Sequence, residues 1–487
     1  MTSQQITVLI ILIVYLVANV VIGLVYGKVR DSRSSLSKEN KYFIGGRGMN
    51  GLILAMTTMA TYTSVSSFVS GPGAGGMTYG YTQVWVAATQ VPVTFMVLGV
   101  LGNKLAIVSR RTGAVTVAGY LRARYKSDLL VVVTSLLMVV FFIVQMIGQF
   151  KGGATLVSVI TGMDYKIGLL IFAIVVVIYT AFGGFTAVVI TDTIQGLIMC
   201  LGTAILLISA FTAGGGLANI NANLAAKLPD VWDNLTGIFG PGTLLSYWIL
   251  VGFGTIGLPQ TAVRAMGFKN TKSLHSAMWI GAVTCAFVIV GMHLAGVWCG
   301  ALIDTSTLPN SDYFIPTVVL QIMPVGIAGL FLAAPLAAVM STVSSLLILA
   351  SAAIIKDIYR TYYVKDNAER QAKYEKNLSK FTIGGTLVVG IVTVLLALNP
   401  PDIIWVLNLF AMGGLECAFF WPLVGGIFFK KGTKQGAIAS AFCGMAMILL
   451  SKLGVNIPYL SLTSLIPAII AYVVVSLLTQ KKEAVAK

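Results

Sequence analysis

The sequence predicts an all-α polytopic membrane protein, and three observations support this fold class. The chain of 487 residues is 57% hydrophobic and only 10% charged, which is too little polar surface for a water-soluble protein of this length. Its apolar stretches are long, and most reach the roughly 17 to 25 residues that a helix needs to cross a bilayer. The basic residues are concentrated between alternate stretches. These uniformly apolar runs do not alternate as the strands of an outer-membrane barrel do.

About thirteen segments are predicted to cross the membrane. They lie at 6–26, 50–73, 82–103, 128–150, 167–185, 188–212, 243–262, 276–301, 326–355, 380–398, 403–429, 435–451 and 460–479. An odd number of spans places the two termini on opposite sides. One side then receives 28 of the 32 Lys and Arg residues, and only Lys151, Lys166, Lys227 and Lys452 remain for the other. By the positive-inside rule the N-terminus is predicted outside and the C-terminus in the cytoplasm.

The formal net charge of +16 is explained by this topology. Basic clusters beside membrane spans anchor to anionic lipid headgroups, so membrane lipids are the expected partners and nucleic acid is not. The five cysteines show no CxxC spacing and have no nearby histidine. They are predicted to be buried apolar side chains, so neither a disulfide nor a cofactor is expected.

Two apolar segments carry signs of a helix break. Residues 52–76 contain eight Ser and Thr residues before Gly71-Pro72-Gly73, and a regular helix is not expected to continue through that end. Five segments later, residues 251–264 contain three glycines that lead into Pro259. Such breaks at matching positions of two five-segment halves are typical of inverted-repeat transporters, which bind substrate and ion there. Close helix packing is the alternative explanation for the small residues.

The ninth segment carries a hydroxyl cluster in an otherwise apolar helix. The cluster consists of Ser341, Thr342, Ser344 and Ser345. A hard monovalent cation such as sodium requires several neutral oxygens, and hydroxyls together with carbonyls freed at a helix break supply them. The alternative is that these hydroxyls bond to carbonyls of the preceding turn.

Three motifs give the chain a family resemblance. YTAFGGFTAVVITDTIQG at 179–196, GLPQTAVRAMGFK at 257–269 and AAPLAAVMSTVSS at 333–345 resemble signatures of the sodium:solute symporter family. The resemblance covers nearly the whole chain. It implies a core of two inverted five-helix repeats, here 50–212 and 243–429. One peripheral helix is then expected at 6–26 and two within 435–479.

The resemblance also implies sodium as the coupling ion. The ion is expected between the second and ninth segments, held by the backbone carbonyls of Ala60, Thr63 and Ala338 and by the hydroxyls of Ser341 and Thr342. Asp192 matches an acidic residue that the family places on the sodium exit path. The alternative for Asp192 is that it caps the start of the sixth segment.

Within the family, the stretches 42–74, 291–296 and 408–423 most resemble bacterial carriers of pantothenate. The resemblance therefore implies import of this small anion across a bacterial inner membrane, and another small carboxylate or an amino acid such as proline is the alternative. Substrate contacts are predicted at the breaks and in helices that reach the pocket. The predicted residues are Tyr62, Ser67, Gln149, Lys151, Gln260 and Glu416.

Two of these assignments keep an alternative. Lys151 can instead extend its ammonium group to the outer interface, and Glu416 can make a structural hydrogen bond within the bundle. An intramembrane enzyme is a remote third hypothesis. The only histidines are His275 and the isolated His293, and no HExxH or GxSxG motif occurs, so no catalytic residues are expected.

Overall fold

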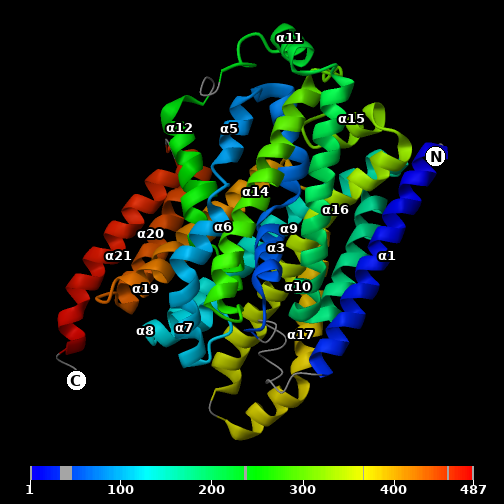
Figure 1. Ribbon diagram of the computed structural model, residues 1–487. Helices are drawn as coiled ribbons and strands as arrows, with labels where there is room; N and C mark the ends of the chain where they lie inside the picture. The colour runs from blue at the N-terminus through cyan, green and yellow to red at the C-terminus, as the bar shows by residue number, and fades with distance from the viewer. Residues whose placement is uncertain (1–2, 33–46, 235–238, 366, 458–459, 485–487) are drawn as a thin grey trace.

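The computed structural model describes residues 3–32, 47–234, 239–365, 367–457 and 460–484, and every regular element in these ranges is a helix (Figure 1). Each of the thirteen predicted apolar segments is mostly helical, and three of them, 50–73, 82–103 and 243–262, contain an internal interruption. Among the described residues, nine helices are long and apolar enough to cross a membrane, or up to eleven if each of two bent pairs forms one span. This helical architecture is what the sequence predicts.

The N-terminal half contains α1 (Ser3–Ser32), α3 (Gly51–Tyr62), α4 (Gly71–Ala74), α5 (Thr82–Ala88), α6 (Val93–Met96), α7 (Asn103–Thr112), α8 (Val117–Tyr125), α9 (Asp128–Thr161) and α10 (Tyr165–Ala213). The C-terminal half contains α11 (Leu217–Lys227), α12 (Gly240–Tyr247), α13 (Pro259–Ala262), α14 (Thr271–Gly300), α15 (Phe314–Ile322), α16 (Val325–Ala352), α17 (Ala368–Ala397), α18 (Ile404–Phe420), α19 (Gly426–Phe428), α20 (Lys434–Lys452) and α21 (Leu460–Ala484).

The first predicted break is present, but it lies earlier in the chain than the sequence suggests. Helix α3 ends at Tyr62, Thr63 is extended, and the chain bends by 73° before a second helical stretch that begins at Ser66. The expectation of a break at Gly71-Pro72-Gly73 is wrong, since residues 71–74 form α4 between two π-helical turns. Pro72 lies inside the helical stretch that begins at Ser66, and the π-helical turns before and after α4 depart there from the regular α-helical hydrogen-bond pattern.

The second break is where the glycines and Pro259 place it. The stretch from Gly240 to Gly257 and the stretch from Pro259 to Met266 meet at an angle of 46°, and Leu258 between them is extended. Pro259 is the first residue of α13, a position that suits its fixed φ and lack of an N–H group.

Helix α10 contains two of the predicted segments. Its 49 residues are interrupted at Gly184, whose φ of 65° and ψ of −176° are not helical. A straight helix of this length measures about 73 Å, more than twice the roughly 30 Å hydrocarbon core. The element is therefore two spans that meet at Gly184, where the positive φ favours glycine.

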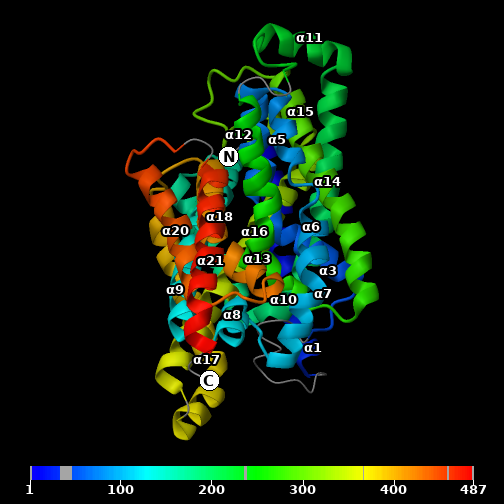
Figure 2. The same ribbon diagram turned by 90° about the vertical axis from the view of Figure 1, so that its left-hand side faces the viewer.

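The centre of the bundle is α16. In the most apolar stretch of the span that contains it, 94% of the residues are buried, compared with 28% for α1 and 33% for α17. Figure 2 shows α20 and α21 side by side, next to α18. The exposed large apolar side chains lie along such outer helices, for example Val14 on α1 and Leu395 on α17. Lipid is the environment that suits this surface.

Segments that are predicted to lie at the cytoplasmic side are in contact with one another at one end of the molecule. Met49 pairs with Phe268 through the backbone, and the Arg110 guanidinium donates to the carbonyl of Phe268 at 2.7 Å. Arg124 donates to the carbonyl of Gly426 at 2.8 Å. Figure 1 shows α7 and α8 at the bottom, near the C-terminus, and α11 at the opposite end. Helix α11 lies between the predicted spans 188–212 and 243–262, and its Ile220 packs in a small apolar cluster with Val297 of α14.

Candidate ion and substrate sites

The first break and α16 meet at the predicted sodium ligands. The Ser341 hydroxyl on α16 donates to the carbonyl of Ala60 on α3 at 2.9 Å and to the carbonyl of Ala338 at 3.2 Å. All three residues are fully buried. The hydroxyl therefore bridges two of the predicted carbonyl ligands, which places three of the five predicted residues within direct contact.

The other two predicted ligands, Thr63 and Thr342, are also fully buried, and neither hydroxyl has a hydrogen-bond partner among the described residues. A buried hydroxyl without a partner costs about 1 to 3 kcal/mol. Thr63 is the extended residue that ends α3, and Thr342 follows Ser341 on the facing helix. Neutral oxygens with unused lone pairs at a helix break fit a small hard cation.

One turn closer to the basic end, a buried ion pair and its hydrogen bonds join four helical segments. Arg264, which follows α13, contacts Asp192 of α10 at 3.2 Å, and the two side chains are 1% and 0% exposed. The same guanidinium nitrogen donates to the hydroxyl of Thr61 on α3 at 2.7 Å and to the hydroxyl of Ser345 on α16. Thr57 donates to Asp192 at 2.8 Å. Asp192 thus lies deep in the bundle and is not an interfacial cap.

The predicted substrate residues Tyr62 and Ser67 line an enclosed cavity beside the first break. Its other walls come from α5, α14, α18 and the helical turn after α12. The lining residues are Ser64, Ser66, Gly71, Gln83, Val86, Gln90, Tyr247, Val251, His293, Trp405, Asn408, Leu409 and Met412. The cavity volume is about 30 Å³, far below the roughly 300 to 1,000 Å³ that is typical of ligand pockets. Its walls must move apart to admit an organic solute.

Gln149 and Gln260 are not among the residues that line the cavity. Gln149 accepts a hydrogen bond from the backbone N–H of Val65 at 3.1 Å, so it holds the open turn of the break. Gln260 donates to Gln145 at 3.5 Å, and Gln145 donates at 3.1 Å to Asn408, which lines the cavity. The tyrosine hydroxyl of Tyr62 donates to the carbonyl of Val251 at 2.6 Å, which links the two broken helices.

Glu416 faces the second break. It is 1% exposed, and its Oε1 has no hydrogen-bond partner in the described parts of the chain. A side chain on Gly254 would approach Oε2 to 2.2 Å, so this glycine leaves the space that the carboxyl group fills. The structural hydrogen bond proposed as the alternative role of Glu416 is not seen at Oε1.

Lys151 forms an ion pair and is not among the residues that line the cavity. Its ammonium lies 2.6 Å from the carboxylate of Asp312, with side-chain exposures of 11% and 0%, and it also donates to the carbonyl of Asp402 at 3.1 Å. Asp312 accepts from the backbone N–H of Ile404, the first residue of α18. This cluster ties α9 and the segment before α15 to the start of α18.

Replacing Lys151 by methionine is therefore expected to reduce stability more than substrate affinity. Removal of one partner from a buried pair leaves an uncompensated charge and costs about 3 to 5 kcal/mol. The melting temperature in detergent should fall for Lys151→Met and recover in the double variant Lys151→Met with Asp312→Asn. A raised KM for the substrate together with an unchanged melting temperature would instead place Lys151 in the binding site.

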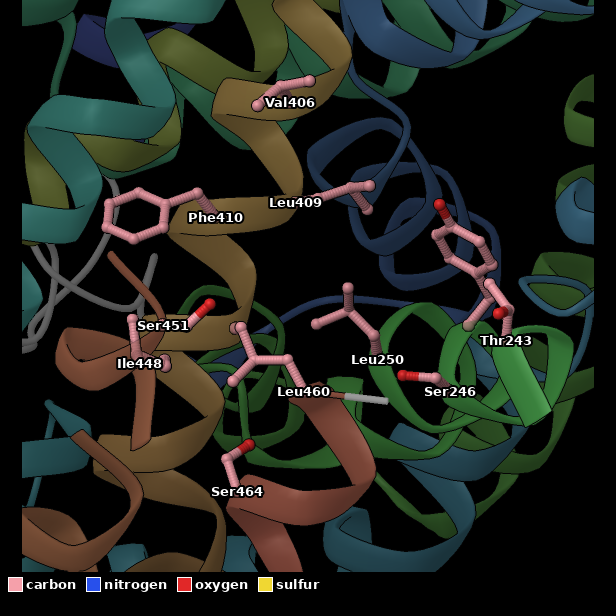
Figure 3. Close-up of a pocket in the computed structure, with 12 residues that line it drawn as sticks. Thr243, Ser246, Leu250, Val406, Leu409, Phe410, Ile448, Ser451, Leu460 and Ser464 are labelled. Carbon is pink, nitrogen blue, oxygen red and sulfur yellow. The ribbon is translucent and has the colours of Figure 1, made fainter. Parts of the chain in front are cut away.

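A larger pocket of about 440 Å³ lies beside the cavity, between α12, α18, α20 and α21. Figure 3 shows Leu250 and Leu409 pointing into its central space, with Ser246 and Ser464 at its margin. Tyr247 and Leu409 line both spaces, so they form the partition between them. Tyr247 stacks on Trp405 with 6.0 Å between ring centroids. No pattern in the sequence predicted that Tyr247 and Leu409 separate these two spaces.

Comparison with known proteins identifies the family. The family model described as "Sodium:solute symporter family" matches residues 42–444. The chain belongs to this family. Two similar curated relatives are named sodium/pantothenate symporter. The one from Haemophilus influenzae is 45% identical over 86% of this chain and 85% of its own length. The one from Escherichia coli is 42% identical over 96% of this chain and 95% of its own length.

A solved structure of a Na+-coupled sialic acid symporter, described as a substrate-bound outward-open state, is similar in fold. It covers 97% of this chain at 21% sequence identity with a TM-score of 0.77, and 98% of that chain is matched. The predicted all-helical fold class is thus confirmed. Together with the family match, it makes the protein a multi-pass membrane transporter with a broken helix in each half.

Proposed function

We propose that this protein is a sodium-coupled symporter that imports pantothenate across the bacterial inner membrane by alternating access. The observation that carries the proposal is the junction between the break after α3 and the hydroxyls of α16, where Ser341 contacts the Ala60 carbonyl. Relatives at 45% and 42% identity that bear the name sodium/pantothenate symporter support the substrate. We assign residues 50–212 and 243–429 to the two repeats.

The proposed sodium site consists of Ala60, Thr63, Ala338, Ser341 and Thr342. In the structure the Ser341 hydroxyl donates a hydrogen bond to the Ala60 carbonyl. A cation at this position withdraws both oxygens from that hydrogen bond and is also coordinated by the unpartnered Thr342 hydroxyl and by the Thr63 carbonyl. Sodium binding then fixes the end of α3 against α16, which sets the geometry of the adjacent substrate cavity.

The proposed substrate site is the cavity that contains Tyr62 and Ser67. The helical stretch after the break begins at Ser66, and its N-terminus lies at the cavity with the hydroxyls of Ser64, Ser66 and Ser67. A helix N-terminus favours an anion through its dipole, and here the backbone N–H groups of Val65 and Ser66 are already bonded to Gln149 and Ser64. The serine hydroxyls are suited to donate hydrogen bonds to the carboxylate of pantothenate.

The decisive test is uptake of radiolabelled pantothenate into cells that lack their own carrier. Uptake is expected to saturate, to require sodium, and to persist when proline, acetate or a sugar is added in excess. Sodium-dependent uptake of proline without uptake of pantothenate would assign the chain to amino acid transport instead. Choline in place of sodium is the matched ionic control.

The proposed topology is tested by labelling single cysteines in a variant without the five native ones. Arg111→Cys and Glu369→Cys are exposed positions at the basic end, and Asp230→Cys is exposed at the other. In intact cells an impermeant maleimide is expected to label only the cysteine at position 230, because the basic connections face the cytoplasm. Labelling at position 369 in intact cells would contradict the assigned orientation.

A further inference from the structure

Three exposed lysines share a small area at the basic end of the molecule, where α7 meets α19. Lys104 on α7 holds its ammonium 4.0 Å from the centre of the Phe428 ring on α19. Lys430 and Lys431 follow shortly after Phe428, and the Cα atom of Lys430 lies within about 8 Å of that of Phe428, because successive Cα atoms are about 3.8 Å apart. All three lysines are exposed. We call Lys104, Lys430 and Lys431 the basic surface.

No carboxylate within the chain balances this charge. The sequence contains no Asp or Glu between positions 40 and 127 or between positions 417 and 482. Of the three ion pairs in the described parts of the chain, none includes a lysine of the basic surface. The exposed lysines of α17, Lys373 and Lys376, differ in this respect, because they share their helix with acidic residues. The basic surface therefore carries a local positive charge that attracts an anion from outside the chain.

The turn that carries two of these lysines is fastened by Arg124 of α8. The Arg124 Nε donates to the carbonyl of Gly426 at 2.8 Å, and its Nη2 donates to the carbonyls of Phe429 and Lys430 at 3.2 Å each. The Phe429 carbonyl also accepts from the backbone N–H of Gly432 at 3.0 Å, which closes the turn. A basic side chain at the C-terminal end of a helix satisfies carbonyls in this way. Arg124 is thus occupied by backbone carbonyls, whereas the lysines of the basic surface are not.

Exposed apolar side chains adjoin the basic surface. Phe428, on which the Lys104 ammonium rests, is 46% exposed, and Val100 and Ile107, about one turn before and after Lys104, are also exposed. Figure 1 shows α7, α8 and α19 together at this end of the bundle. Apolar groups in such a position suit acyl chains, while lysines at the ends of membrane spans suit phosphate headgroups. A free phosphate or a soluble acidic peptide would match the charge but leave the apolar side chains exposed.

We propose that the basic surface binds the headgroup of an anionic phospholipid, whose acyl chains lie along Phe428 and the exposed face of α7. The lipid belongs to the cytoplasmic leaflet, because the proposed topology places this end of the molecule there. Helix α7 lies in the first proposed repeat and α19 in the second, so one bound lipid bridges the two repeats. Lipid binding at this surface is independent of which solute is transported.

The test is a lipid titration of the purified full-length protein in detergent, with the melting temperature as the readout. Dioleoyl phosphatidylglycerol is expected to raise the melting temperature saturably and more than dioleoyl phosphatidylcholine, since a ligand that binds the folded state stabilises it. In Lys430→Gln/Lys431→Gln, the apparent affinity for phosphatidylglycerol should fall about thirtyfold, which corresponds to about 2 kcal/mol for two lysines. High potassium chloride should weaken the wild-type response by screening, while the sodium concentration stays constant.

Lys373→Gln/Lys376→Gln is the matched control, because it removes the same charge from exposed positions of α17. Its affinity for phosphatidylglycerol should stay within about twofold of the wild type. A melting temperature in phosphatidylcholine equal to that of the wild type shows that each variant is folded. Equal losses in the two double variants would mean diffuse attraction and overturn the site, as would wild-type affinity in Lys430→Gln/Lys431→Gln. Potassium phosphate should not reproduce the rise, and an equal rise with it would overturn the assignment to a lipid.

Discussion

Replacing Arg264 by alanine is expected to abolish sodium-driven uptake and to destabilise the protein. The guanidinium is 1% exposed and is the charge partner of Asp192, which is fully buried. Its loss leaves a carboxylate in the centre of the bundle without a cation, and breaking such a pair costs about 3 to 5 kcal/mol. The hydrogen bonds to Thr61 and Ser345 disappear with it. The measurements are uptake in proteoliposomes and the melting temperature in detergent.

Two control variants separate charge from geometry in this cluster. Arg264→Lys keeps the charge, but a single ammonium cannot reproduce the planar guanidinium, so partial stability without full transport is expected. Thr57→Val removes one hydrogen bond to Asp192 and should cost only about 1.5 to 3 kcal/mol. If Arg264→Ala melts and transports like the wild type, the pair has no role in holding α3, α10 and α16 together.

Replacing Ser341 or Thr342 by alanine is expected to raise the sodium concentration for half-maximal uptake about tenfold or more. Each substitution removes one neutral oxygen, and a loss of about 1.4 kcal/mol corresponds to a factor of ten in affinity. Adjacent helical residues point about 100° apart, so both can serve one ion only in the cleft between α16 and α3. The Ser341 bond to Ala60 lies in that cleft.

The control for this pair is Ser344→Ala. The Ser344 hydroxyl donates to the carbonyl of Ser341 on its own helix at 3.2 Å, so its loss should leave the sodium dependence nearly unchanged. Because sodium and substrate binding are linked, the apparent substrate affinity of Ser341→Ala should fall at low sodium and recover at high sodium. The measurement is a sodium titration of uptake in proteoliposomes, and identical titrations for all three variants would remove the proposed ion site.

The sequence predicted the helices and both breaks because their signals are local. Long apolar runs define spans, and Pro259 after three glycines marks the second break. The first break was placed too late, because Gly71-Pro72-Gly73 has strong turn propensity while Thr63, the residue that ends α3, has none of note. The π-helical turns on both sides of α4 absorb the proline, and no sequence signal announces them.

The site was predicted only in part because its remaining contacts join distant residues. Lys151 and Asp312 are 161 positions apart, and no periodicity relates them. His293 looked isolated in the sequence because its cavity partners lie on other helices, among them Gln83 of α5. Asn408 lies in a stretch that carries the family resemblance, which is the one signal that could have drawn attention to it.

The measurement that tests the central claim most directly is the driving force for pantothenate accumulation in proteoliposomes. The account predicts accumulation against a concentration gradient when sodium is higher outside. It predicts no accumulation when a proton gradient of equal size is imposed in sodium-free buffer, because the proposed ligands are carbonyls and hydroxyls, not a titrating carboxylate. Ser341→Ala should respond to the sodium gradient only at raised sodium. Equal accumulation with the proton gradient alone would contradict sodium coupling.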